Sequence, residues 1–227
     1  MRLLLAAVVF VVILALSATA VKNKETAKAD DGDIKVFFAA DSFDSHAFVE
    51  GIWDSKLIPY FKERAIDALE LRQAVKADAD AAGARYGYRA VAEGNPFNYA
   101  VKGKVKILSP ESKSKAGKVT SVLADVAPFD GEADIVLLLG PVFKGAAVNS
   151  IRDMLDFVSF GDVKNQVEFS KLARELNSTA VKTAIAPADL GEDGGIGKVF
   201  EMYGATTVKG NDANFNVIPV ILTPASE

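Results

Sequence analysis

The sequence predicts an α+β protein in which an N-terminal helical region packs on a C-terminal, five-stranded OB-like β-barrel. Two patterns of apolar spacing support this prediction. Apolar residues recur every three or four positions between residues 49 and 69, as in an amphipathic helix, and every second position from residue 99, as in a half-buried strand. From residue 98 onwards the predicted order is three strands, a helical insertion and two strands, which is the layout of an OB-type barrel.

The first residues are typical of export. Residues 3–21 are almost wholly apolar, Arg2 precedes them, and the A-x-A signal at residues 18–20 is a cleavage pattern. As a helix, this segment would be roughly 28 Å long, close to the roughly 30 Å core of a bilayer, so residues 1–21 are either a signal peptide or a retained inner-membrane anchor. Residues 22–33 are charged and lack apolar periodicity, as in a linker. Both alternatives place the folded body in the periplasm or otherwise outside the cytoplasm.

Composition excludes several kinds of site. The chain has no cysteine, which removes disulfides, thiol nucleophiles and thiolate metal ligands, and its single histidine rules out a histidine-rich metal centre. The formal net charge is −4, so the body is a poor candidate for nucleic-acid binding. We therefore expect no cofactor, no metal and no nucleic-acid partner.

Residues 34–97 are predicted to be mainly helical. After a candidate strand at residues 34–38, the capping side chains of residues 41–45 favour a helix start, and Pro59 is expected to begin a new helix or kink the old one. Apolar spacing then predicts one amphipathic helix that runs from residue 58 into an alanine-rich tail and ends near Gly83 and Gly87.

Residues 98–227 are predicted to form the barrel. A turn-rich connection at residues 109–116 follows the first strand, and the helical insertion is expected at about residues 147–177. The third strand is continuously apolar, which is typical of burial on both faces. The five strands are expected at residues 99–107, 118–126, 135–139, 198–208 and 216–223.

The densest polar cluster near glycines lies inside the helical insertion. Its members could hydrogen-bond a sugar or the backbone of a partner protein. The alternative is that they form internal hydrogen bonds that fix the turn between two helices, since buried polar groups need partners. No nucleophile–base pair is visible, so we expect no catalytic residue. The candidate ligand- or partner-binding residues are Arg152, Asp153, Asp162, Asn165, Gln166 and Glu168.

Asp41, Asp44 and His46 are a second polar group, which could bind a metal or act as acid and base. Carboxylates in front of a predicted helix more often cap its first backbone amides. The pattern therefore favours a helix cap beside an exposed histidine.

Short motifs spread over the body carry a resemblance. They are FVEGIWDSK at residues 48–56, Ile58-Pro59, Gly140-Pro141 with Gly145, IRD at 151–153, FGDVKNQVEF at 160–169, ARELN at 173–177, Gly197-Lys198 and Pro219-Val220. With these motifs the chain resembles an uncharacterised family of bacterial predicted periplasmic lipoproteins. The resemblance implies an exported, membrane-tethered accessory protein, often encoded beside sugar-importing ABC transporters, and no established activity. Because the chain has no cysteine to accept a lipid, we expect no lipid anchor, which favours a retained apolar helix.

These observations give two functional hypotheses. The first is a non-enzymatic accessory or interaction protein that contacts a carbohydrate ABC transporter or its binding protein. The second is a periplasmic module that binds a sugar or oligosaccharide at the barrel mouth and residues 165–168. A hydrolase would need two carboxylates facing one cleft.

Overall fold

The computed structural model describes residues 43–89, 95–210 and 215–226, and residues 43–227 form one compact unit. The leader, the linker and the candidate strand at residues 34–38 lie outside the described residues. In the described ranges, no helix combines the length and the apolar character that are needed to cross a bilayer.

The first described helices form one continuous run. Helix α2 (Ser45–Ile52) passes through a π-helical segment, η2 (Trp53–Leu57), into α3 (Ile58–Arg64). The carboxylate of Asp44 caps α2 by accepting hydrogen bonds of 3.0 Å from the backbone amides of His46 and Ala47. Pro59 lies in the first turn of α3, where a missing amide is tolerated.

The prediction of a single helix from residue 58 to residue 84 is wrong. The chain becomes extended after α3, and β1 (Ile66–Asp67) pairs in parallel with Val101 and Lys102. Asp67 then caps α4 (Ala68–Ala77) through its side chain, and Asp78 in the same way caps α5 (Ala79–Tyr86). Helical spacing of apolar residues does not reveal such breaks, because each carboxylate also suits an exposed helical position.

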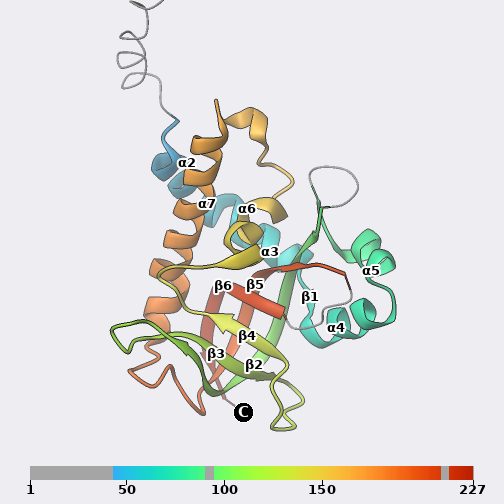
Figure 1. Cartoon of the computed structure of the whole chain (residues 1–227), viewed down its shortest axis with the longest axis vertical. Helices are drawn as coiled ribbons and strands as arrows, with labels where there is room; N and C mark the ends of the chain where they lie inside the picture. Colours follow the sequence, from blue (N-terminus) through green and yellow to red (C-terminus); the bar gives the residue numbers. More distant parts are fainter. Residues whose placement is uncertain (1–42, 90–94, 211–214, 227) are drawn as a thin grey trace, which may run out of the picture. The chain divides into compact units, whose positions relative to one another are not determined.

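Five further strands pair in a ring and confirm the predicted OB-like fold. They are β2 (Phe97–Lys113), β3 (Val119–Val126), β4 (Ile135–Leu138), β5 (Val199–Val208) and β6 (Phe215–Ala225). The sheet order is β1-β2-β3-β4-β6-β5, and β5 pairs again with β2 (Figure 1). The β4–β6 pair is parallel, and the other pairs of the ring are antiparallel.

Two strands differ in detail from their predictions. β2 continues into the predicted connection as far as Lys113, because irregular pairing with β3 accommodates Pro110, and the turn itself begins at Ser114. In β4, Ile135 and Leu137 are buried while Val136 and Leu138 are only partly buried, so the strand is not buried on both faces as expected.

The helical insertion lies between β4 and β5. It comprises η3 (Gly145–Asn149), α6 (Ser150–Met154), η4 (Phe160–Asp162), α7 (Gln166–Ala180), η5 (Val181–Ile185) and η6 (Ala186–Ala188). It therefore extends beyond the predicted residues 147–177. Figure 1 shows α7 running beside the sheet, with α2 near one end of α7.

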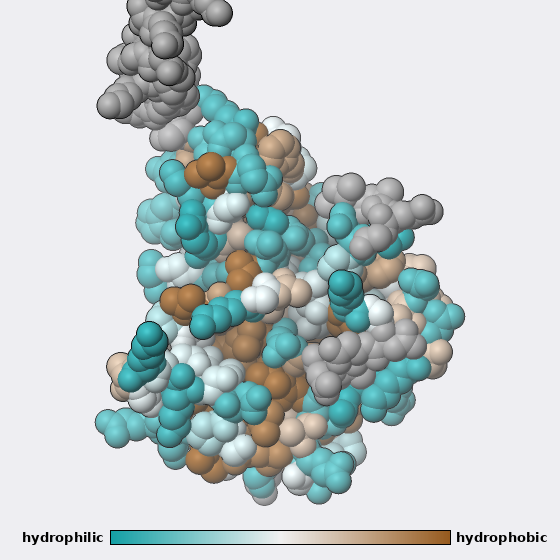
Figure 2. Space-filling model, in the orientation of Figure 1, coloured by the Kyte–Doolittle hydropathy of each residue, from teal (hydrophilic) through white to brown (hydrophobic). Residues whose placement is uncertain are grey.

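Two apolar cores hold these layers together. One fills the ring and includes Tyr99, Val101 and Met202, with Leu71 of α4 packed against it. The other lies between the sheet and the helices, where Trp53 and Leu172 meet apolar side chains from β2, β5 and β6. On the surface, Figure 2 shows apolar side chains gathered over the strands and mainly hydrophilic side chains over the helical part.

Candidate functional site

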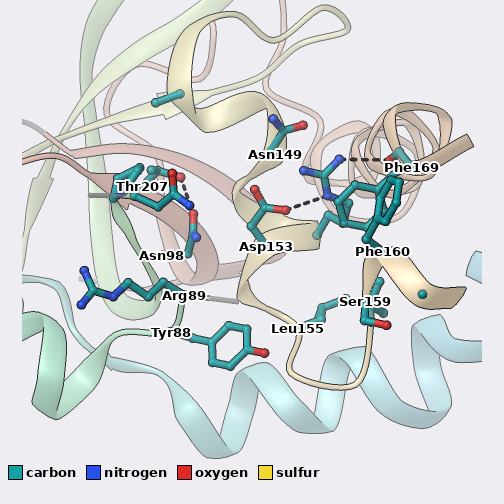
Figure 3. A pocket seen from close by; sticks show the side chains of 16 residues that line it. Tyr88, Arg89, Asn98, Asn149, Asp153, Leu155, Ser159, Phe160, Phe169 and Thr207 are labelled. Atoms are coloured by element: carbon teal, nitrogen blue, oxygen red, sulfur yellow. Dashed lines mark hydrogen bonds and ion pairs between the residues drawn. The ribbon is translucent and has the colours of Figure 1, made fainter. Parts of the chain in front are cut away.

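A cleft of about 580 Å³ lies where the first residues of β2 and the last residues of β5 meet the helical insertion. Its polar lining comes from segments that are far apart in the chain, as Figure 3 shows. Asn98 and Thr207 come from the sheet, whereas Asn149, Arg152 and Asp153 come from the insertion. The cleft is therefore a product of the tertiary fold.

Arg152 is the most enclosed charged residue in the cleft wall, with 6% of its surface exposed. Its Nε donates a 2.7 Å hydrogen bond to Asp153 Oδ1, and its Nη1 donates a 3.0 Å bond to the carbonyl of Phe169. The guanidinium also lies over the Phe169 ring, with Cζ 3.7 Å from the ring centroid. These contacts fix the side chain at the cleft.

The sheet side of the cleft is fixed by a second set of hydrogen bonds. Thr207 donates from Oγ1 to Asn98 Oδ1 over 2.7 Å, which leaves the amide nitrogen of the buried Asn98 as the donor end of that side chain. Tyr88 and Asn98 exchange backbone hydrogen bonds of 2.8 and 2.9 Å, which hold Tyr88 at the cleft wall.

An aromatic pair forms the rim on the insertion side. The rings of Phe160 and Phe169 meet edge to face, with centroids 5.5 Å apart and an interplanar angle of 87°. Phe160 remains 50% exposed, which is unusual for so large an apolar side chain. Phe169 also carries the Arg152 guanidinium over its ring. The two phenylalanine rings therefore form a fixed apolar surface beside the polar groups of the cleft.

The other predicted site residues have different positions. Neither Asp162, Asn165, Gln166 nor Glu168 lines the cleft. Asp162 forms a capping box with Ser159, and Asn165 caps α7 by accepting 3.0 Å bonds from two backbone amides. Gln166 is exposed at the first position of α7.

Glu168 joins α7 to the beginning of the described body. One carboxylate oxygen accepts a 3.0 Å hydrogen bond from the amide of Lys164, and the other accepts a 3.2 Å bond from the amide of Phe43. These two bonds lower the pKa of Glu168, with that from Lys164 contributing most. The side chain of Glu168 therefore stabilises the turn before α7 and holds the backbone at Phe43, the first described residue, against this turn.

Sequence reasoning missed the sheet residues of the cleft. Asn98, Asn149 and Thr207 are isolated polar residues, and no local motif marks them. The available signal for Asn98 was a polar residue at the start of a strand. In the described ranges, no group of three or more His, Asp or Glu residues could hold a metal ion.

Comparisons with known proteins agree with the fold and with export. A family model described as "Predicted periplasmic lipoprotein (DUF2291)" matches residues 8–223, which supports an extracytoplasmic location. The crystal structure of an OB-fold protein from Thermotoga maritima MSB8 superposes with a TM-score of 0.62 at 16% sequence identity, covering 82% of this chain and 100% of that one. At this identity the likeness shows the fold alone. No curated protein matches the chain.

Proposed function

We propose that this chain, which belongs to the family of predicted periplasmic lipoproteins of unknown function, is a non-enzymatic accessory protein that binds a small polar solute for a carbohydrate ABC uptake system. The observation that carries the binding part is the cleft at Arg152. It combines enclosure, a fixed apolar surface and a few oriented polar groups, as small-molecule sites do. The site differs from the sequence hypothesis because none of residues 165–168 lines the cleft, and the side chains of Asn165 and Glu168 bond to backbone amides around the start of α7 instead.

The cleft chemistry favours binding over hydrolysis. Asp153 is the one carboxylate among the described residues that line the cleft, and it accepts a hydrogen bond from Arg152. Glycoside hydrolysis generally uses two carboxylates that flank the scissile bond. A non-enzymatic role is therefore the simpler proposal for this lining.

The uptake part of the proposal rests on export and on an exposed surface beside the cleft. Phe160 in η4 and Val167 in the first turn of α7 are 50% and 62% exposed. Exposed apolar residues near a binding site suit contact with a transporter component or its binding protein. In this proposal a retained segment at residues 3–21 keeps the body close to the inner membrane.

A thermal-shift panel of sugars, sugar acids, polyols and amino acids tests solute binding. A ligand at one hundred times its dissociation constant stabilises a protein by about 2.7 kcal/mol. For a domain of this size that is a rise of roughly 5–11 °C in the unfolding midpoint. If no compound in the panel raises the midpoint, the binding proposal fails.

Mild crosslinking in membranes followed by affinity purification tests the partner. The expected result is recovery of ABC transporter subunits or their solute-binding protein. A Val167→Asp variant, which places a charge on the exposed apolar surface away from the cleft lining, should reduce this recovery while leaving the thermal shift unchanged. Recovery of the same background proteins with the wild type and the variant would refute the uptake part alone.

A further inference from the structure

We infer that the cleft selects an electrically neutral, polyhydroxylated ring that places two adjacent hydroxyls against Arg152 and Asp153 and a carbon-rich face against Phe160. This inference deepens the proposed function and rests on it. It specifies the charge and the hydrogen-bonding pattern of the solute, which the cleft volume leaves open.

The unused polar atoms offer a donor beside an acceptor. Arg152 donates to protein through Nε and Nη1, and Asp153 accepts through Oδ1, which leaves Arg152 Nη2 and Asp153 Oδ2 without a hydrogen bond in the described structure. A guanidinium only donates and a carboxylate only accepts. Two hydroxyls on neighbouring carbons match this pair, because one can accept from Nη2 while the other donates to Oδ2.

The fixed charges around the centre of the cleft balance. Arg152 and Asp153 form an ion pair, and the remaining central side chains, such as Asn98 and Asn149, are neutral amides. Arg89 also lines the cleft, but its guanidinium stacks over the Phe97 ring at 4.2 Å from the centroid and points away from Asp153 (Figure 3). A carboxylate or phosphate at the centre would therefore meet the negative charge of Asp153, and the adjacent cation, Arg152, is already paired with that carboxylate.

The aromatic rim supplies the apolar contact. Phe160 is half-exposed at the cleft, and its ring is oriented by the edge-to-face contact with Phe169. A pyranose or furanose ring has C–H groups on one face and hydroxyls at its edge. Such a ring can cover the Phe160 side chain while its edge reaches the ion pair, whereas a linear polyol or an amino acid offers no comparable face.

The test compares matched ligands and matched variants. Isothermal titration of the full chain with D-glucose, D-galactose and maltose is set against D-glucuronate, D-galacturonate and glycine. We expect at least one neutral sugar to bind at least tenfold more tightly than its uronate. Asp153→Asn should weaken binding of that sugar at least tenfold and reduce the ratio of its affinity to the affinity of the uronate. Asp54→Asn, the same change at an exposed position outside the cleft, should leave both affinities unchanged.

Phe160→Ala keeps the test informative if the Asp153 variant misfolds. Because Phe160 is half-exposed, this variant should retain the unfolding midpoint within a few degrees and lose at least fivefold in sugar affinity. Tighter binding of a uronate or of glycine would overturn the inference and leave solute binding standing. Unchanged sugar binding in both cleft variants would also overturn it. Binding of none of the ligands in this series or in the wider panel would remove the proposed function together with the inference.

Discussion

Replacing Gly204 by alanine is expected to destabilise the protein, whereas the same replacement at Gly51 is expected to stabilise it. Gly204 lies in β5 at a register shift in the pairing with β6. A Cβ atom at Gly204 would lie 2.5 Å from Val217 Cγ1 and 2.7 Å from the carbonyl oxygen of Ile218. The second atom belongs to the backbone of β6, so a side-chain rotation cannot relieve the contact.

The expected magnitudes follow from these surroundings. Forcing an extra methyl group into a packed core costs about 1–3 kcal/mol. Gly51 lies near the end of α2, inside the continuous helical run, and a Cβ atom there would meet nothing within 4 Å. Alanine in an open helical position is more stable than glycine by about 0.5–1 kcal/mol. The two variants therefore differ in sign although the chemical change is identical.

Urea unfolding followed by circular dichroism and tryptophan fluorescence measures both effects. For a domain of 150–250 residues, 1 kcal/mol corresponds to roughly 2–4 °C in the unfolding midpoint, so a thermal scan gives an independent value. The single tryptophan, Trp53, is buried in the core between the sheet and the helices, where its fluorescence reports tertiary unfolding. A Gly204→Ala variant as stable as the wild type would refute the close approach of β5 and β6.

Three further predictions concern the helical insertion. Arg152→Lys should lose about 1–3 kcal/mol in urea unfolding, because lysine cannot reproduce the forked hydrogen bonds or the stacking on Phe169, whereas the exposed Arg174→Lys should change little. Asn165→Ala should cost about 1 kcal/mol through loss of the α7 cap, and Asn165→Asp should restore it; equal stability of all three proteins would contradict the capping role. The lowered pKa of Glu168 contributes stability above its unfolded pKa, and this stability is lost as the pH falls through the folded pKa. Glu168→Gln should therefore flatten the acid side of the stability–pH curve, and an unchanged acid limb would contradict this.

The strands of the OB-like sheet could be predicted well from the sequence because strand burial follows a local rule. Val101, Val105 and Ile107 alternate with lysines, and all three are buried in the structure. The helix break after α3 could not be predicted in the same way. Its cause is the pairing of Ile66 with Val101, a contact between residues far apart in sequence that leaves no trace in local spacing.

The candidate site was predicted only in part for a related reason. The polar cluster contained Arg152 and Asp153, which line the cleft, but also Asn165 and Glu168, whose side chains bond to backbone amides near α7. Capping residues and ligand-binding residues have the same chemistry, so composition does not separate them. Asn98 lines the same cleft as Arg152 because β2 pairs with β5, and this pairing could not be predicted from the local sequence.

Neighbouring strands in the ring share unequal numbers of residue pairs, and this affects where the sheet is expected to open when the protein is heated or concentrated. β2 and β5 share ten residue pairs, from Phe97↔Val208 to Lys106↔Val199, whereas β4 and β6 share three. Because the parallel β4–β6 pairing has few residue pairs, we expect the ring of strands to open there first. Opening it would unpair the segment of β6 that includes the buried Phe215 and Val217, and an unpaired strand edge of this kind can pair with a second chain. We therefore expect strand exchange at this edge to be the preferred aggregation route, so concentrated or heated samples should associate through β6 while the helices keep their native packing.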